Sequence, residues 1–201
     1  MQMKTKESLT SDKSDFIAKI IETSIRIVES NGLEYLKLSN VSYVTGYSKS
    51  HIYNYFGNRL GILDIVIEHL FLQMKTEILN SLPNNLGFAE LFITMVHRRK
   101  DFILKNKVLE SYFKRSVRVT KQFKDFNKII KKKEDILFAN ISSKYYETDK
   151  NMMTYIGLDF WQIWTLVLPL DLRNKFLLSQ DNKETEQKMR SIFNVNQGVS
   201  F

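Results

Sequence analysis

The segment from Thr45 to Phe56, TGYSKSHIYNYF, holds four aromatic rings, one glycine and three small hydroxyl side chains in twelve positions. After the glycine the pattern favours a short helix. Hydrogen-bonding or short side chains, of the kind that base edges and phosphates accept, share one face of it: Lys49, Ser50, His51, Asn54 and Tyr55. Either the rings are core and the polar groups are solvated surface, or this face contacts a polar partner.

The sequence contains no other pattern of residues that carries chemistry. The three histidines His51, His69 and His97 are scattered, and there is no HExxH motif, no glycine-rich phosphate loop and no cysteine. Glu68 beside His69 is interpreted as a surface or domain-interface pair rather than a catalytic dyad. We therefore expect no enzyme, no metal and no cofactor, although a carboxylate pair formed at tertiary distance stays open.

Composition favours a mostly helical protein. Among 201 residues there are only 7 Gly and 2 Pro, and 43% are hydrophobic. The lack of cysteine excludes disulfides and agrees with a reducing cytoplasm. The N-terminus is polar, and the longest apolar run, residues 160–170, is far shorter than the ~20 residues of a membrane-spanning helix. We expect a cytoplasmic protein with no membrane segment.

The net charge of +8 is unevenly distributed along the chain. Residues 97–133 carry +11, whereas residues 1–60 carry only +2. A basic segment of this kind is usually a solvated helix face, and an acidic ligand or partner is the alternative. The sequence does not decide between these readings of 97–133.

Apolar spacing predicts an all-α fold. In the N-terminal part the expected helices cover Ser14–Asn31, about 39–44, about 48–56 and about 58–82, with Ile17, Ile20, Ile21, Ile27 and Val28 forming the stripe of the first. Longer helices follow, at about 87–105, 107–118, 120–146, 149–168 and 183–194. We predict a small helical domain over 1–60, a bridging helix over about 58–82, and a larger helical domain over 61–201.

The three N-terminal helices match a helix-turn-helix arrangement. Gly32 is expected to end the first helix, Gly46 supplies the positive φ of the turn, and Ser48 is a good N-cap for the helix that follows. Contacts between the two short helices are expected from five residues: Val41, Val44, Ile52, Tyr53 and Phe56. In such a motif the second short helix enters the DNA major groove.

The run from Gly32 to Leu63, GLEYLKLSNVSYVTGYSKSHIYNYFGNRLGIL, resembles the N-terminal domain of the TetR family of transcriptional regulators. The matching positions are Gly32, Val41, Ser42, Gly46, Tyr53, Phe56 and Arg59. The resemblance covers about residues 14–75. Lys37 departs from a threonine that usually caps the second helix, a role that Ser39 is expected to take over, and Ser42, Thr45 and Ser50 add hydroxyls to a tight motif.

The resemblance implies a set of DNA-contacting residues. Asn54 and Lys49 would read bases, while the tyrosine hydroxyls and the Arg59 guanidinium would bind phosphates. The full set is Ser39, Asn40, Ser48, Lys49, Ser50, His51, Tyr53, Asn54, Tyr55 and Arg59.

The resemblance also implies a C-terminal ligand-binding and dimerisation bundle, with helices 149–168 and 183–194 at the dimer interface. Trp161 and Trp164 are expected to be packing residues, with ligand contact as the alternative. Aromatic or soft side chains in the appropriate helices are candidates for a small-molecule site: Phe92, Met95, Phe102, Tyr112, Phe113, Phe126, Met153 and Trp164. The basic segment would suit an anionic effector, and the rings a planar apolar one.

The expected function is that of a repressor that binds a palindromic operator as a homodimer and is released by a small molecule. The alternative is a co-activator or adaptor of the same fold that acts through a protein partner, which the small head charge leaves open. A helical bundle on a membrane surface is a third reading, but no basic amphipathic face with exposed tryptophans supports it.

Overall fold

The structure is a computed structural model that describes residues 6–83, 86, 88–114 and 121–145, together with Lys183, Gln187, Arg190 and Ser191. Up to residue 145 this described part forms seven α-helices and one short 3-10 helix, and it contains no strand. The predicted all-α class is confirmed. The predicted helix 149–168 lies outside the described residues, as does most of 183–194. None of the described helices has the length and apolar character needed to cross a membrane.

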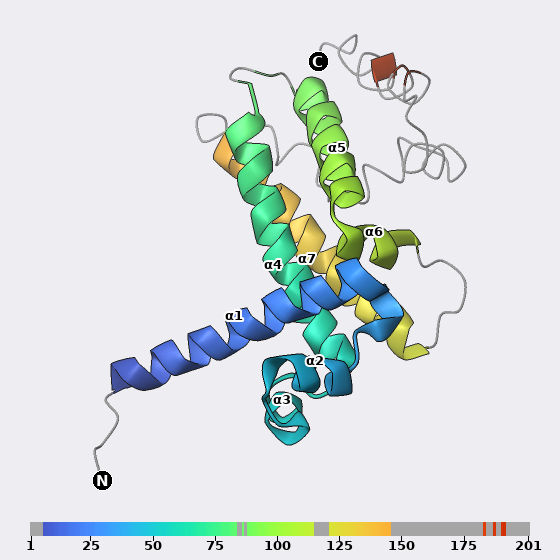
Figure 1. The fold of residues 1–201 in the computed structure, drawn as a ribbon. Coiled ribbons are helices and arrows are strands. Elements are labelled where there is room, and N and C mark those ends of the chain that lie inside the picture. Colours follow the sequence, from blue (N-terminus) through green and yellow to red (C-terminus); the bar gives the residue numbers. More distant parts are fainter. Residues whose placement is uncertain are drawn as a thin grey trace. The chain divides into compact units, whose positions relative to one another are not determined.

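The helices follow the predicted order (Figure 1). They are α1 (Lys6–Asn31), η1 (Leu33–Tyr35), α2 (Leu38–Thr45), α3 (Lys49–Phe56), α4 (Arg59–Ser81), α5 (Phe88–Lys105), α6 (Lys107–Lys114) and α7 (Lys121–Tyr145). The largest difference is that α1 begins at Lys6 instead of Ser14. No glycine or proline interrupts residues 6–14, so a helix nucleated by its packed half extends through polar residues.

The chain forms two compact units that do not follow its order. Unit 1 combines Met1–Phe71 with Ile103–Ile130, and unit 2 combines Leu72–Phe102 with Lys131–Phe201. The division into 1–60 and 61–201 stays a prediction.

The core of unit 1 is built on one face of α1. Ile20, Ile21 and Val28 of the predicted stripe are buried, but Ile17 is only partly covered. Phe16, which the stripe did not include, is only 4% exposed. The buried face therefore begins one residue earlier than predicted. Further along the chain, the same core includes Leu33, Leu36, Val41, Ile52, Ile62, Leu63, Val66, Ile67 and Leu70.

Polar contacts fasten α6 within unit 1. The Lys107 ammonium donates to the Glu29 carbonyl near the end of α1 at 2.9 Å. Asn106 caps the N-terminus of α6, since its Oδ1 accepts from the Val108 backbone N–H at 3.2 Å. The Tyr112 hydroxyl donates to Asn127 Oδ1 of α7 at 2.6 Å. The positive charge of Lys107 is favourable at the C-terminal end of α1, because the helix dipole leaves that end negative.

Unit 2 contains a buried ion pair between α5 and α7. Arg99 Nε donates to Glu134 Oε1 at 2.5 Å, and Arg99 Nη2 donates to Oε2 at 3.3 Å. Glu134 is fully buried, and Arg99 nearly so. Lys100, the next residue on α5, is also buried; loss of hydration lowers the pKa of its ammonium, partly offset by the Asp101 carboxylate.

Candidate nucleic-acid interface

The turn between α2 and α3 has the predicted helix-turn-helix geometry, and α2 and α3 lie beside α1 (Figure 1). Gly46 has φ 77°, and its N–H donates to the Ser42 carbonyl at 2.9 Å. Two of the three hydroxyls that depart from the family pattern are bound to backbone. Ser42 Oγ donates to the Tyr47 carbonyl and Thr45 Oγ1 to the Val41 carbonyl, each at 2.7 Å. They therefore brace the turn rather than disturb it.

Ser48 caps α3 as predicted. Its Oγ accepts from the His51 backbone N–H at 3.1 Å. Ile52 is fully buried beneath α3, and Phe56 is partly buried at its end. The cap and this apolar side fix which side chains of α3 face outward.

Four of the predicted contact residues form the outward face of α3: Lys49, Ser50, Tyr53 and Asn54. Tyr53 is 60% exposed, so most of its side chain lies outside the packing between the two short helices that the sequence predicted. The same holds for Val44, which is 56% exposed. Val41 and Thr45 face inward on α2, and at ~100° per residue Val44 lies ~80° around the helix from the middle of that face, so it is on the flank of α2. The side-chain amide of Asn54 makes no hydrogen bond within the described part of the chain.

His51 and Tyr55, also predicted to contact DNA, lie on the flank of α3 that meets α1. Both are exposed, yet both rings contact Phe16, with centroid distances of 4.6 Å and 4.9 Å. Tyr47 packs on the same Phe16 ring edge-to-face at 4.8 Å. The aromatic residues of the segment are therefore divided between an outward face and a flank built around one ring of α1.

Two predicted residues hold the short η1 helix. Asn40 Nδ2 donates to the Tyr35 carbonyl at 2.8 Å. The Arg59 guanidinium donates from Nη2 to the Leu33 carbonyl at 2.5 Å. Both side chains join separate helices, α2 and α4, to one turn, so they position the motif. Phosphate contact by either residue stays a prediction.

Ser39 does not cap α2, contrary to the expectation. The helix begins at Leu38, Lys37 occupies the N-cap position, and no side chain caps this end. Ser39 is an exposed residue of the first turn. The uncapped N–H groups and the positive end of the helix dipole make this end of α2 suited to an anion such as a phosphate.

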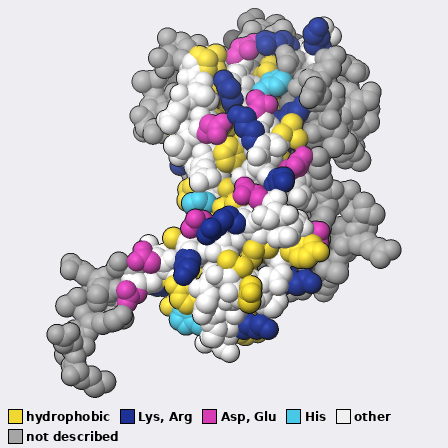
Figure 2. All heavy atoms as spheres, in the orientation of Figure 1, with side chains coloured by type: hydrophobic (Ala, Val, Ile, Leu, Met, Phe, Trp, Pro, Cys, Tyr) yellow, Lys and Arg dark blue, Asp and Glu magenta, His cyan; other side chains and the backbone are white. Residues whose placement is uncertain are grey.

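Charged side chains of both signs are interspersed with apolar ones on the face shown in Figure 2. On α7, Lys128 forms an exposed ion pair with Asp125 at 3.4 Å. On this face the basic side chains form no single continuous patch, and the role of the segment 97–133 stays open.

The predicted ligand residues fall into separate groups. Tyr112 contacts Phe113 and Phe126 in unit 1, with ring centroids 5.0 Å and 6.0 Å apart. Phe92, Met95 and Phe102 are buried along α5 in unit 2. Met153 and Trp164 lie outside the described residues, as does Trp161. A common ligand site for this set stays a prediction.

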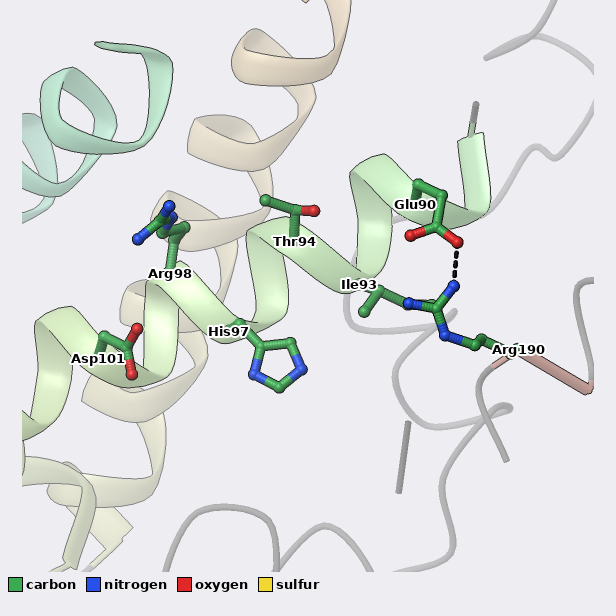
Figure 3. Close-up of a pocket in the computed structure, with 7 residues that line it drawn as sticks. All are labelled: Glu90, Ile93, Thr94, His97, Arg98, Asp101 and Arg190. Atoms are coloured by element: carbon green, nitrogen blue, oxygen red, sulfur yellow. Dashed lines mark hydrogen bonds and ion pairs between the residues drawn. The ribbon is translucent and has the colours of Figure 1, made fainter. Parts of the chain in front are cut away.

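A pocket of about 280 Å³ lies on α5 in unit 2, on a face that the sequence did not single out (Figure 3). Its described lining consists of Glu90, Ile93, Thr94, His97, Arg98, Asp101 and Arg190. Arg190 forms an ion pair with Glu90 at one end. The lining is mainly polar and charged, unlike the aromatic site that the sequence predicted.

Other structural residues were also missed, and some left a signal in the sequence. Arg99 and Glu134 each interrupt an apolar stripe, and a charge in a stripe predicts a buried partner. Gly61, inside α4, was also missed although it left a signal in the sequence. An isolated glycine in a helix often marks a close approach of another part of the backbone. A Cβ at Gly61 would lie 1.8 Å from the Phe56 carbonyl oxygen.

Comparison with known proteins identifies the fold. The chain is similar to the structure of a TetR-family transcriptional regulator from Vibrio parahaemolyticus, with a TM-score of 0.52 and 15% identity over 87% of this chain and 94% of that one. The fatty acid degradation regulator FadR from Bacillus halodurans aligns with a TM-score of 0.48 and 10% identity, over 99% of this chain and 90% of FadR.

A TetR-family regulator from Haemophilus influenzae aligns with a TM-score of 0.40 and 16% identity, over 89% of this chain and 97% of the other. No protein-family model matches the chain, and no curated protein matches it in sequence. The first comparison shows that the chain has the fold of TetR-family transcriptional regulators.

Proposed function

We propose that this protein, which has the fold of TetR-family transcriptional regulators, represses transcription by binding a palindromic operator as a homodimer. The observation that carries the proposal is the outward face of α3. Lys49, Ser50, Tyr53 and Asn54 are exposed together on a capped helix that a glycine turn sets beside α2. Lysine and asparagine are side chains that bind guanine and adenine edges in the major groove.

The small net charge of residues 1–60 supports dimerisation, because one such domain would make few phosphate contacts. Residues 1–60 carry a net charge of +2, and affinity for DNA increases with the number of phosphates that a protein neutralises. A symmetric dimer doubles the phosphate contacts and places two recognition helices on half-sites about 34–36 Å apart.

Release by a small molecule is the regulatory part of the proposal. An effector must prefer the DNA-incompetent arrangement, and a near-complete switch requires about 5.5 kcal/mol of differential affinity. The pocket on α5 and the aromatic residues of α6 and α7 are two chemically different places for such a molecule.

Binding to the DNA upstream of the protein's own gene tests the proposal. We expect the dimer to prefer this duplex over a random duplex of equal length, with log K falling steeply against log salt because counterions are released. The measurement is fluorescence anisotropy at salt concentrations from about 50 to about 300 mM. The expected slope of log K against log salt is about −0.9 for each phosphate that the protein neutralises. A dimer with no preference at low salt would contradict the operator proposal.

Asn54→Ala is expected to reduce specific binding without unfolding the head, since the side chain is exposed. Loss of a bidentate base contact costs about 1–3 kcal/mol of discrimination at each half-site. The preference for the upstream duplex over random DNA should fall, while binding to random DNA stays close to wild type. Asn80→Ala, an exposed asparagine of α4, is the matched control and should behave as wild type. An unchanged preference in the Asn54 variant would remove this residue from the recognition face.

A second function, as an adaptor for a protein partner, is favoured by one observation. Tyr43 is 90% exposed and lies beside exposed Val44 on α2, so the head presents apolar surface. If the binding experiment detects no preference for upstream DNA, this surface becomes the first place to seek a partner.

A further inference from the structure

Two lysines of α1 lie over aromatic rings of α3 and of the turn before it. Lys13 Nζ is 5.9 Å from the centre of the Tyr55 ring, and Lys19 Nζ is 5.3 Å from the centre of the Tyr47 ring. Both distances are in the range of cation–π contacts. Both lysines are exposed, so the rings hold charged groups that remain in contact with solvent.

Phe16 fixes the geometry of this contact. It lies between the two lysines in the α1 sequence at a spacing of three residues, which is close to one helical turn. Its ring packs on His51 at 4.6 Å, and His51 lies between Tyr47 and Tyr55 at a spacing of four. This row of α1 therefore runs along a row formed by α3 and the turn before it, with a buried ring in the middle and a cation at each end.

The dimensions of DNA indicate which groups the side of α3 that faces α1 would contact. An α-helix with its side chains is about 10–12 Å wide, and the major groove is about 12 Å wide. A recognition helix in the groove thus fills it, and groups beside the helix lie at the phosphate walls. Lys19 lies six positions after Lys13 on the helix, a rise of about 9 Å. That separation is sufficient for each lysine to reach a different phosphate.

We propose that Lys13 and Lys19 bind phosphates of one DNA strand beside α3, and that the rings of Tyr55 and Tyr47 hold their ammonium groups in place. This inference rests on the proposed operator binding and extends the interface to a helix that the sequence did not implicate. Lys49 is the only cation within α3, so the two lysines of α1 supply charge that the recognition helix lacks. Phosphate contacts carry no sequence information, so they add affinity rather than specificity.

Equilibrium binding of Lys13→Ala and Lys19→Ala tests the proposal. The probes are the upstream duplex and a random duplex of equal length. Each lost phosphate contact reduces the salt slope by about 0.9, so either variant of a two-headed dimer should lose about 1.8. If wild type and variant bind equally at about 1 M salt, this difference in slope makes the variant about 60-fold weaker at about 100 mM salt. The loss should be equal for both duplexes, and Lys→Arg at either position should restore most of the binding.

Lys132→Ala is the matched control, because it removes one exposed lysine of α7 and changes the net charge equally. Its salt slope should stay at the wild-type value. Slopes of the Lys13 and Lys19 variants that equal this control would overturn the inference while leaving operator binding intact. Weaker binding with an unchanged slope and a lower melting temperature would also overturn it, since the lysines would then be structural. Absence of salt-dependent binding by wild type would overturn both proposals.

Discussion

Glu134→Ala is expected to lower the free energy of unfolding by about 3–5 kcal/mol, the cost of leaving one member of a buried ion pair without its partner. Glu134 is fully buried and receives two hydrogen bonds from Arg99, at 2.5 Å and 3.3 Å. Domains are typically stable by about 5–15 kcal/mol, so the loss is a large fraction of the total. Urea denaturation with linear extrapolation measures it.

The exposed ion pair of Asp125 and Lys128 provides the control for Glu134. Both side chains are mostly in solvent, and pairs of this kind contribute about 0–1 kcal/mol. Asp125→Ala should therefore change stability little. The double variant Arg99→Met with Glu134→Leu should recover most of the loss, since apolar replacement of both members of a buried pair is often neutral or stabilising. The explanation fails if Glu134→Ala is no more destabilising than Asp125→Ala.

Gly61→Ala is expected to destabilise unit 1 by about 3 kcal/mol or more and to abolish specific DNA binding in the proposed assay. Alanine is ordinarily better than glycine inside a helix by about 1 kcal/mol. Here the added Cβ would lie 1.8 Å from the Phe56 carbonyl oxygen and 2.9 Å from its carbon. These are backbone atoms at the C-terminal end of α3, so the recognition helix itself must shift.

The join between α3 and α4 has little room for that shift. The Phe56 carbonyl accepts from the Asn58 N–H at 2.8 Å, and Asn58 Oδ1 accepts from the Leu60 N–H at 2.7 Å as the cap of α4. Gly46→Ala is the comparison, because nothing lies within 4 Å of its added Cβ and only the positive φ of 77° is strained. That strain costs about 1–2 kcal/mol. A Gly61→Ala protein as stable as wild type would refute the close approach.

Much of the fold could be predicted from the sequence because its signals are local. Apolar spacing places α4, α5 and α7 within a residue or so of their observed bounds. Two of the three described glycines at positive φ, Gly32 and Gly46, and the Ser48 cap follow from backbone chemistry within a few residues. Such signals do not depend on what packs against them.

The features that were missed depend on residues distant in sequence. Phe16 is buried because rings of α3 and of the turn before it cover it, more than thirty positions later in the chain. Arg59 has the charge expected of a phosphate contact, but its hydrogen bond goes to Leu33 across the motif. The position of the first α2 turn was missed because the helix begins without a capping side chain. Local propensity cannot show which partner tertiary packing brings to a side chain.

The hydroxyls that brace the α2–α3 turn have a thermodynamic consequence for recognition. Ser42 and Thr45 each fasten a side chain to a backbone carbonyl, and Thr45 Oγ1 also accepts from the Tyr47 N–H at 3.3 Å. The turn is therefore ordered before any ligand arrives. Association is weakened by whatever conformational entropy is lost when an interface becomes rigid. A turn that is already immobilised contributes little to this loss, so the recognition helix is presented preorganised.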